Sequence, residues 1–235
     1  DATIDPQSLH DYFLFQYVPA PRCIFRDFAK LMPGHYAIIT ADSHWPPAQT
    51  PFWTPPPPQR FSGSYADAKH RLGELLEAAV RKRLISDVPL GAFLSGGMDS
   101  SVVVALMRRL GVTPLRTYSI GFPDPRYDET RYARRVAAHF QTEHHEEIVT
   151  PHALEILDTL SYLYDEPFGD SSAIPTYYVS RAARRSIKVA LTGDGGDEAF
   201  GGYDRYIAAQ LAARLDRLPA FIRGACAAAG RLLPR

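Results

Sequence analysis

Apolar residues recur along the chain at two spacings, which together predict an alternation of helices and strands. In residues 65–85 they follow the three-and-four spacing of one helix face, at Leu72, Leu75, Leu76, Ala79 and Val80. Short apolar runs of strand length lie between the helical segments. The pattern predicts helices over 65–85, 102–110, 130–140, 151–164 and 174–185, and strands over 88–94, 115–122, 145–149 and 188–192.

Strands separated by helices of this length predict an α/β fold, in which a parallel sheet is covered by helices on both faces. Ligands of such sheets bind at the carboxyl ends of the strands. Three strands end in glycine there: Leu94 is followed by Ser95-Gly96-Gly97, Ile120 by Gly121 and Thr192 by Gly193. The alanine-rich residues 207–229 predict two packed helices that break at Pro219.

The first 53 residues form a separate unit in this interpretation. Residues 6–17 predict a short helix, residues 35–40 a strand, and the surroundings of Phe52 and Trp53 a second strand. Four prolines at 55–58 predict a stiff extended connector. We therefore place a domain boundary between residues 1–58 and 59–235; a proline-rich surface loop inside one domain is the alternative.

Composition excludes several classes of protein. The 235 residues are 46% hydrophobic and 22% charged, enough for a sizeable core, and 26 basic side chains balance 26 acidic ones. This balance argues against nucleic acid or an anionic membrane as a partner. Cys23 and Cys226 match no metal-site spacing and fit a reducing cytoplasm. The lack of a long apolar run predicts a soluble protein, and the termini suggest a segment of something longer.

The most informative segment is residues 91–101, which read GAFLSGGMDSS. A strand ends at Ser95-Gly96-Gly97, and Asp99, Ser100 and Ser101 then open a helix. Backbone N–H groups at such a turn, the helix dipole and the serine hydroxyls favour a phosphate, and Asp99 is placed to hold Mg²⁺. No Gly-Lys-Ser/Thr follows, so this is not a Walker loop. A plain strand-to-helix turn with a serine cap is the alternative.

A second motif, GDGGDEAFGGY at residues 193–203, combines five glycines with three acids. The glycines predict a tight loop with an exposed backbone instead of a helix or strand. Asp194, Asp197 and Glu198 supply oxygen ligands or proton acceptors. Asp99 and Asp197 could hold Mg²⁺ between them at the mouth of the sheet. A calcium loop is the competing interpretation, but the acids lack the EF-hand spacing.

SGGMDSS resembles the SGGxDSS loop of the PP-loop ATP pyrophosphatases. Together with GDGGDEAFGGYDRY it resembles the glutamine-dependent asparagine synthetase B family. Residues 165–176 look like the substrate-side loop of that family, and residues 17–21 and 30–35 look like the segment that joins its two domains. The resemblance covers most of the chain.

The resemblance implies a two-domain amidotransferase that uses ATP and Mg²⁺. An N-terminal glutaminase domain, missing here, would release ammonia, which reaches the synthetase domain through a tunnel. There the carboxylate of aspartate would attack the α-phosphate of ATP, giving an acyl-adenylate and pyrophosphate, and ammonia would displace AMP to form asparagine. The enzyme would be cytoplasmic, with small-molecule substrates, and a homodimer is one assembly left open.

The resemblance also implies roles for individual residues. Asp99 and Asp197 would hold the metal, and Asp194 would orient ammonia or accept its proton at the acyl-adenylate, where family members carry Glu or Asp. The backbones of Leu94, Ile120 and Gly121 would line the adenine pocket, with Thr192 and Gly193 near the ribose. The pyrophosphate would be bound by Ser95, Gly96, Gly97, Asp99, Ser100 and Ser101.

Two departures from the family pattern bear on this assignment. Its glutaminase nucleophile is an N-terminal cysteine, which this chain lacks, and neither Cys23 nor Cys226 takes that role. The C-terminal portion, which carries a catalytic lysine, is also absent. A β-lactam synthetase-like enzyme, a polymer-modifying amidotransferase and a nucleotide-binding module without turnover remain alternatives.

Several polar residues have a structural interpretation beside the functional one. Asp165, Glu166 and Asp170 are evenly divided between loop structure and contact with the acceptor amino acid. Asp128 is expected to cap a helix. The remaining candidates, expected to be structural instead of metal ligands, are His139, His144 and His145.

Overall fold

The computed structural model describes residues 3–150 and 153–217. The predicted helix break at Pro219 and Cys226 lie outside these residues. The five helices and four strands predicted for residues 65–192 are all present, with bounds that shift by a few residues. None of the described helices is long and apolar enough to cross a membrane.

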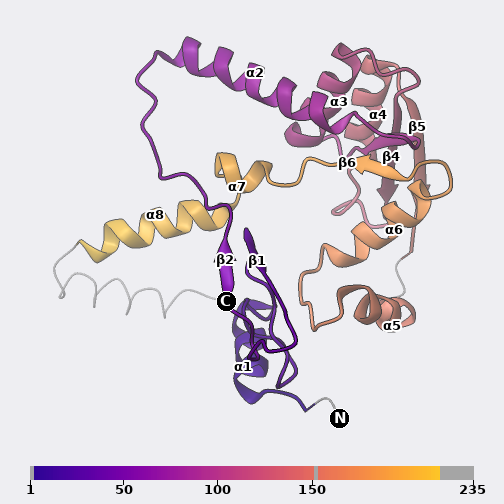
Figure 1. The fold of residues 1–235 in the computed structure, drawn as a ribbon. Helices are drawn as coiled ribbons and strands as arrows, with labels where there is room; N and C mark the ends of the chain where they lie inside the picture. The colour runs from indigo at the N-terminus through magenta and orange to yellow at the C-terminus, as the bar shows by residue number, and fades with distance from the viewer. Residues whose placement is uncertain (1–2, 151–152, 218–235) are drawn as a thin grey trace.

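Four parallel strands form the central sheet in the order β5-β4-β3-β6 (Figure 1). Their bounds are Leu90–Phe93 for β3, Arg116–Gly121 for β4, Glu143–Ile148 for β5 and Val189–Leu191 for β6. The helices of this part are α2 (Tyr65–Arg83), α3 (Met98–Arg109), α4 (Thr130–Phe140), α5 (Ala153–Tyr164) and α6 (Ala173–Ala183). Since β3 lies between β4 and β6, the loops that follow these three strands meet at one edge.

Alternation along the strands divides the core between the two faces of the sheet. Ala92 and Leu94 pack with Val104 and Met107 of α3 and with Ala133 of α4. On the other face, Tyr118 packs with Ala183 and Ile187, against Phe93 and Val179. A third cluster joins α5 to α6 through Ile156 and Tyr178. Helices therefore cover both faces, which confirms the predicted α/β fold class.

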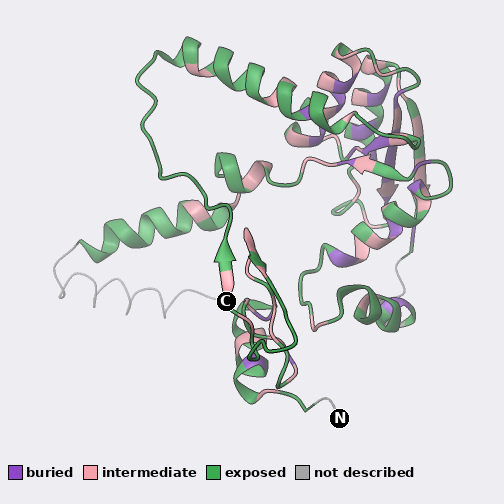
Figure 2. Cartoon of the chain, viewed as in Figure 1, coloured by how far each residue is buried: buried purple, intermediate pink, exposed green. Residues whose placement is uncertain are grey.

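Burial is concentrated in the sheet and in the helices that pack on it, whereas α2 and α8 (Asp204–Asp216) are mostly exposed (Figure 2). The apolar face predicted for α2 is only partly covered: Val80 is buried, but Leu72 and Leu75 are exposed. Helix α2 begins at a capping box in which Ser64 and Asp67 exchange hydrogen bonds.

The N-terminal segment contains α1 (Pro6–Phe15) and an antiparallel pair, β1 (His35–Ala37) and β2 (Gln49–Pro51). The strand predicted around Phe52 and Trp53 lies earlier, because β2 ends at Pro51. The N–H groups of Phe52 and Trp53 both donate to the carbonyl oxygen of Gly34 instead of continuing the ladder. Residues 54–63 have no regular structure and lead to α2.

Two predictions for the end of the chain are wrong in part. The glycine-rich motif at 193–203 is not all loop, because Gly196–Phe200 form a short helix, α7. The alanine-rich stretch begins as helix α8 at Asp204, and its apolar side chains Ile207, Leu211 and Leu215 are exposed instead of packed.

Candidate nucleotide site

The turn after β3 is held by its own serine hydroxyls. The Oγ atoms of Ser95 and Ser100 lie 3.0 Å apart, and the N–H of Gly97 donates to the Ser95 Oγ at 3.2 Å. The Ser101 Oγ donates to the carbonyl oxygen of Gly97 at 2.6 Å. Since Gly97 is the N-cap of α3 and no side chain caps the helix, the first N–H groups of α3 are available to an anion.

Gly96 places this turn directly on the first turn of α4. Its φ of +85° lies in the left-handed region, and a Cβ there would lie 2.4 Å from the backbone nitrogen of Ala133 and 2.5 Å from the carbonyl carbon of Tyr132. Only glycine allows both the conformation and the approach.

The two motifs meet although almost a hundred residues separate them. A Cβ on Gly193 would lie 2.7 Å from the backbone nitrogen of Ser100, and one on Gly196 would lie 2.4 Å from the Cγ of Asp99. The parallel pairing of β3 with β6 brings the second motif to this position. The glycines at 193 and 196 therefore serve close approach between the motifs.

The larger of two neighbouring clefts at this edge has a volume of about 510 Å³. Both motifs line it, together with the end of β3 and the first turn of α6. Its lining residues are Phe93, Ser95, Gly97, Met98, Asp99, Ser100, Thr176, Thr192, Gly193, Asp194 and Asp197.

The smaller cleft, of about 200 Å³, lies between β4 and the first turns of α4 and α6. Phe93, Ser95 and Thr176 line both clefts, so the two are adjacent. Leu94 and Ile120 line the smaller one. The remaining predicted residues, Gly96, Ser101 and Gly121, line neither of these two clefts.

Backbone groups of Leu94 are already used inside the protein. Its N–H donates to the carbonyl oxygen of Tyr118 at 2.9 Å, and its carbonyl oxygen accepts a hydrogen bond from the Ser119 hydroxyl. A ligand in the smaller cleft would therefore find only the second lone pair of that carbonyl.

The three acids of the second motif differ in their surroundings. Glu198 accepts a hydrogen bond of 2.7 Å from the Tyr203 hydroxyl. This bond lowers the pKa of Glu198 and raises the pKa of Tyr203 to about 12. Asp194 and Asp197, by contrast, face the larger cleft.

The residues of the larger cleft fit a Mg²⁺ ion that is shared with a phosphate. Asp99 and Asp197, one from each motif, both line the cleft. Among the described residues, no group of three or more histidine, cysteine, aspartate or glutamate side chains is placed to hold a metal ion. Two carboxylates suffice for Mg²⁺ when phosphate oxygens and water complete the shell.

Two of the three acids of the loop at 165–170 make hydrogen bonds within the protein. Glu166 accepts hydrogen bonds from Lys30 at 2.6 Å and from the N–H of Ile24 at 3.2 Å. Asp170 accepts from the N–H of Ser172 at 2.8 Å. Asp165 adopts a left-handed conformation, with φ of +59°, at the end of α5. The two side chains with described bonds, Glu166 and Asp170, are thus engaged in holding the loop.

Two further expectations concern residues beside the site. The N-cap of α4 is Glu129, not Asp128 as expected from the sequence; the Asp128 carboxylate, one residue earlier, accepts hydrogen bonds from the N–H and the hydroxyl of Thr130 at the start of the helix. His144 pairs with the Thr117 hydroxyl, whereas His145 stacks on Tyr118, so neighbouring histidines serve opposite faces of the sheet.

Sequence reasoning gave Thr176 no role of its own, although it lines both clefts. It lies in the first turn of α6, four residues after Ser172, whose carbonyl oxygen accepts the Thr176 N–H. The sequence feature that could have indicated Thr176 is a hydroxyl residue at the start of a helix that follows a polar loop.

Comparison with known proteins is consistent with this geometry. The family described as asparagine synthase matches residues 71–234. A provisionally named asparagine synthetase [glutamine-hydrolyzing] 2 from Methanocaldococcus jannaschii is 40% identical over 225 residues, which are 94% of this chain and 42% of that protein. Asparagine synthetase [glutamine-hydrolyzing] 1 from Bacillus subtilis is 31% identical over 227 residues, 95% of this chain and 35% of that protein. The chain thus spans about two fifths of the length of these relatives, and it belongs to the asparagine synthase family.

Proposed function

We propose that the chain carries the ATP-binding part of a glutamine-dependent asparagine synthetase. The whole protein would convert aspartate to asparagine through an acyl-adenylate, releasing AMP and pyrophosphate. The observation that carries this proposal is the meeting of two glycine-rich acidic motifs in one cleft, where Gly196 lies against the Asp99 carboxylate.

The larger cleft supplies donors where charge develops during adenylation. The free N–H groups at the start of α3 and the hydroxyls of Ser95 and Ser100 would bind the leaving pyrophosphate. Of these hydroxyls, that of Ser100 is already close to the Ser95 Oγ, so the turn is pre-organised for an anion. Ser101, whose hydroxyl donates to the Gly97 carbonyl oxygen, would support the turn from outside the cleft. Gly97 would let the phosphate approach the backbone, while Gly96 packs the turn against α4.

Asp99 and Asp197 would hold Mg²⁺ against the same phosphates. When bound, this ion neutralises negative charge on the pyrophosphate. Asp194 follows Thr192 and Gly193 at the same cleft, and its N–H donates to the Thr192 hydroxyl at 3.3 Å. That aspartate would orient ammonia or accept its proton, while Thr192 and Gly193 would lie near the ribose.

The smaller cleft would receive the adenine, with Leu94, Ile120 and Gly121 as backbone neighbours. Its adjacency to the larger cleft through Ser95 and Thr176 gives one nucleotide room for both its base and its phosphates. Of these neighbours, Gly121 is the last residue of β4 and lines neither cleft, so it would contribute only by ending the strand beside the smaller cleft.

The remaining parts of the proposal concern the whole protein. Residues 1–58 would be the end of a glutaminase domain and its connector, and residues 59–235 would belong to the synthetase domain. Ammonia would come from glutamine hydrolysed by the part of the protein that precedes this chain. A cytoplasmic location and a homodimer complete the proposal.

Calorimetric titration with Mg·ATP tests the site. We expect binding in the micromolar range, and Asp99→Asn and Asp197→Asn should each weaken it by roughly tenfold or more, about 1.4 kcal/mol. Asp87→Asn is the matched control, because this exposed aspartate precedes β3 at the opposite end of the sheet. Binding that is indifferent to both substitutions in the cleft would refute the metal assignment.

An activity assay tests the proposed acceptor, aspartate. With Mg·ATP present, the protein joined to its N-terminal part should release pyrophosphate when aspartate is added, and asparagine should form only with glutamine or ammonia. If pyrophosphate were released and a product formed without glutamine or ammonia, the result would instead favour cyclisation by an internal amine, as in a β-lactam synthetase-like enzyme.

A further inference from the structure

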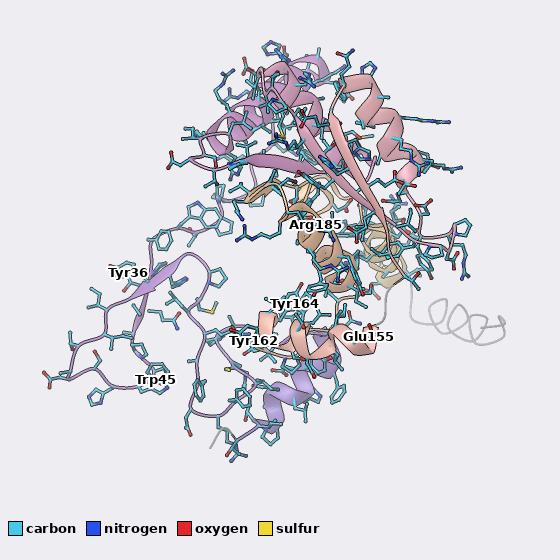
Figure 3. The ribbon with its side chains drawn as sticks, turned by 90° about the vertical axis from the view of Figure 1, so that its right-hand side faces the viewer. Tyr36, Trp45, Glu155, Tyr162, Tyr164 and Arg185 are labelled. Carbon is cyan, nitrogen blue, oxygen red and sulfur yellow. The ribbon has the colours of Figure 1, made fainter. Side chains whose placement is uncertain are left out.

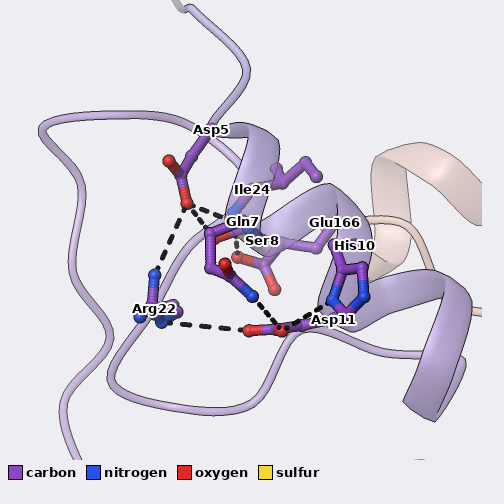
Figure 4. Close-up of polar contacts among 8 residues, drawn as sticks. All are labelled: Asp5, Gln7, Ser8, His10, Asp11, Arg22, Ile24 and Glu166. Carbon is purple, nitrogen blue, oxygen red and sulfur yellow. Dashed lines mark hydrogen bonds and ion pairs between the residues drawn. The ribbon is translucent and has the colours of Figure 1, made fainter.

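The loop between α5 and α6 is tied to a part of the chain that is distant in sequence. The N–H of Gly169 donates to the carbonyl oxygen of Gln16 at 2.7 Å. The Glu166 carboxylate accepts from the N–H of Ile24 and from Lys30, residues 142 and 136 positions earlier. Figure 4 shows Glu166 beside Ile24, and Figure 3 shows Tyr164, at the end of α5, facing the N-terminal segment. Residues 165–170 are thus held from residues 16–30.

Glu166 and Lys30 form a partly buried ion pair at this contact. Their side chains are 16% and 34% exposed, and the Lys30 ammonium also donates to the carbonyl oxygen of Val18, a buried residue. Burial by itself would raise the pKa of Glu166. Hydrogen bonds from Lys30, Cys23 and the Ile24 N–H outweigh it and hold that pKa below its ordinary value. The carboxylate is therefore charged and saturated with donors at neutral pH.

The loop continues directly into the wall of the nucleotide clefts. Helix α6 begins at Ala173, which is buried, and its N-cap Ser172 makes no side-chain capping bond. Pro175 lines the smaller cleft and Thr176 lines both. The direction in which the loop enters α6 hence determines where these two side chains lie.

We propose that Lys30 and Glu166 are a positioning pair, through which the N-terminal segment fixes the first turn of α6 at the nucleotide clefts. The pair contacts no cleft residue itself and acts through the loop at 165–172. The inference rests on the proposed function only in taking Mg·ATP as the ligand of those clefts. Loss of either partner leaves the other charge enclosed without compensation, so each single change should release the loop.

Amide hydrogen exchange of the whole chain tests the first step. Glu166→Gln and Lys30→Met should each raise exchange in residues 165–176 by roughly tenfold or more, the size expected for losing a hydrogen bond to a charged group. Exchange in β4 should stay unchanged. The double variant should be no worse than the poorer single variant, because both remove the same interaction. Lys30→Arg, which keeps the charge, should restore protection.

Mg·ATP affinity, measured on the same variants, tests the second step. We expect roughly three- to tenfold weaker binding for Glu166→Gln and Lys30→Met. Glu147→Gln is the matched control: it removes ion pairs with Arg181 and Arg185 near the other end of α6. This control should change neither loop exchange nor affinity.

The outcomes separate the pair from the proposed function. Unchanged exchange in residues 165–176 would overturn the proposal, and so would faster exchange with unchanged affinity, since the pair would then be structural only. If the unaltered chain bound no Mg·ATP, the proposed function would fail, whereas exchange in residues 173–176 would still decide whether the pair holds α6. Should Glu166→Gln fail to fold, Lys30→Gln carries the same two measurements.

A pH profile supplies an independent check. Because the pKa of Glu166 is lowered from 4.5, its contribution to stability is complete above that value and is lost as pH falls through the folded-state pKa. Glu166→Gln lacks this titration. The difference in Tm between the unaltered chain and Glu166→Gln should accordingly be constant near neutral pH and shrink in acid; a difference that grows in acid would contradict the assignment.

Discussion

Replacing Gly96 by alanine tests the packing of the phosphate turn against α4. An alanine in the left-handed region at φ of +85° costs about 1–2 kcal/mol by itself. Its Cβ would also lie 2.4 Å from the Ala133 nitrogen and 2.5 Å from the carbonyl carbon of Tyr132. Both are backbone atoms of α4, so the contact cannot be relieved by moving a side chain. Such overpacking adds about 1–3 kcal/mol. We therefore expect Gly96→Ala to lower the free energy of unfolding by roughly 2–5 kcal/mol.

Two other glycines separate the contributions. Gly111, at the end of α3, has φ of +86°, but no atom lies within 4 Å of the position that an alanine Cβ would take there. Gly111→Ala should therefore cost only the conformational part, about 1–2 kcal/mol. Gly73 lies exposed in α2 with open space around it, and Gly73→Ala should add about 0.5–1 kcal/mol of stability.

Urea denaturation at constant m-value measures all three variants. Mg·ATP titration of Gly96→Ala should in addition show weaker binding, because the turn must move away from α4. If Gly96→Ala and Gly111→Ala agreed within about 0.5 kcal/mol, the close approach to α4 would contribute nothing and the reasoning would be refuted.

Three further changes test local contacts. Ser64→Ala should cost about 1 kcal/mol by removing the capping box of α2, whereas Ser64→Thr should cost little; equal urea midpoints for both would contradict the cap. Arg108→Lys should cost about 1–3 kcal/mol, because a lysine cannot serve the carbonyl oxygens of Phe140 and Gln141 together, and an unchanged midpoint would show that these bonds add nothing. Glu198→Gln should return the pKa of Tyr203 from about 12 toward 10, as followed by its ultraviolet absorbance; a titration that stayed near 12 would exclude Glu198 as the cause.

Local pattern determined most of the elements. Helix α4 has the predicted bounds, because the spacing of its buried residues is a property of the segment alone. The two motifs could also be recognised from the sequence alone, one as a glycine turn before a helix and the other as acids within a glycine-rich run. What the sequence could not give was the exact end of each strand, since β2 stops where Gly34 takes the N–H groups of Phe52 and Trp53.

Tertiary structure decided how the site is assembled. The short helix α7, the contact of Gly196 with Asp99, and the use of Glu166 as a partner of Lys30 all depend on segments far apart in the chain. The residue types of a segment indicate which chemistry it can perform, because side-chain groups and backbone freedom are local properties. The neighbours of that segment are set by strand order and by which helix covers which face, and these follow from the balance of packing over the whole fold.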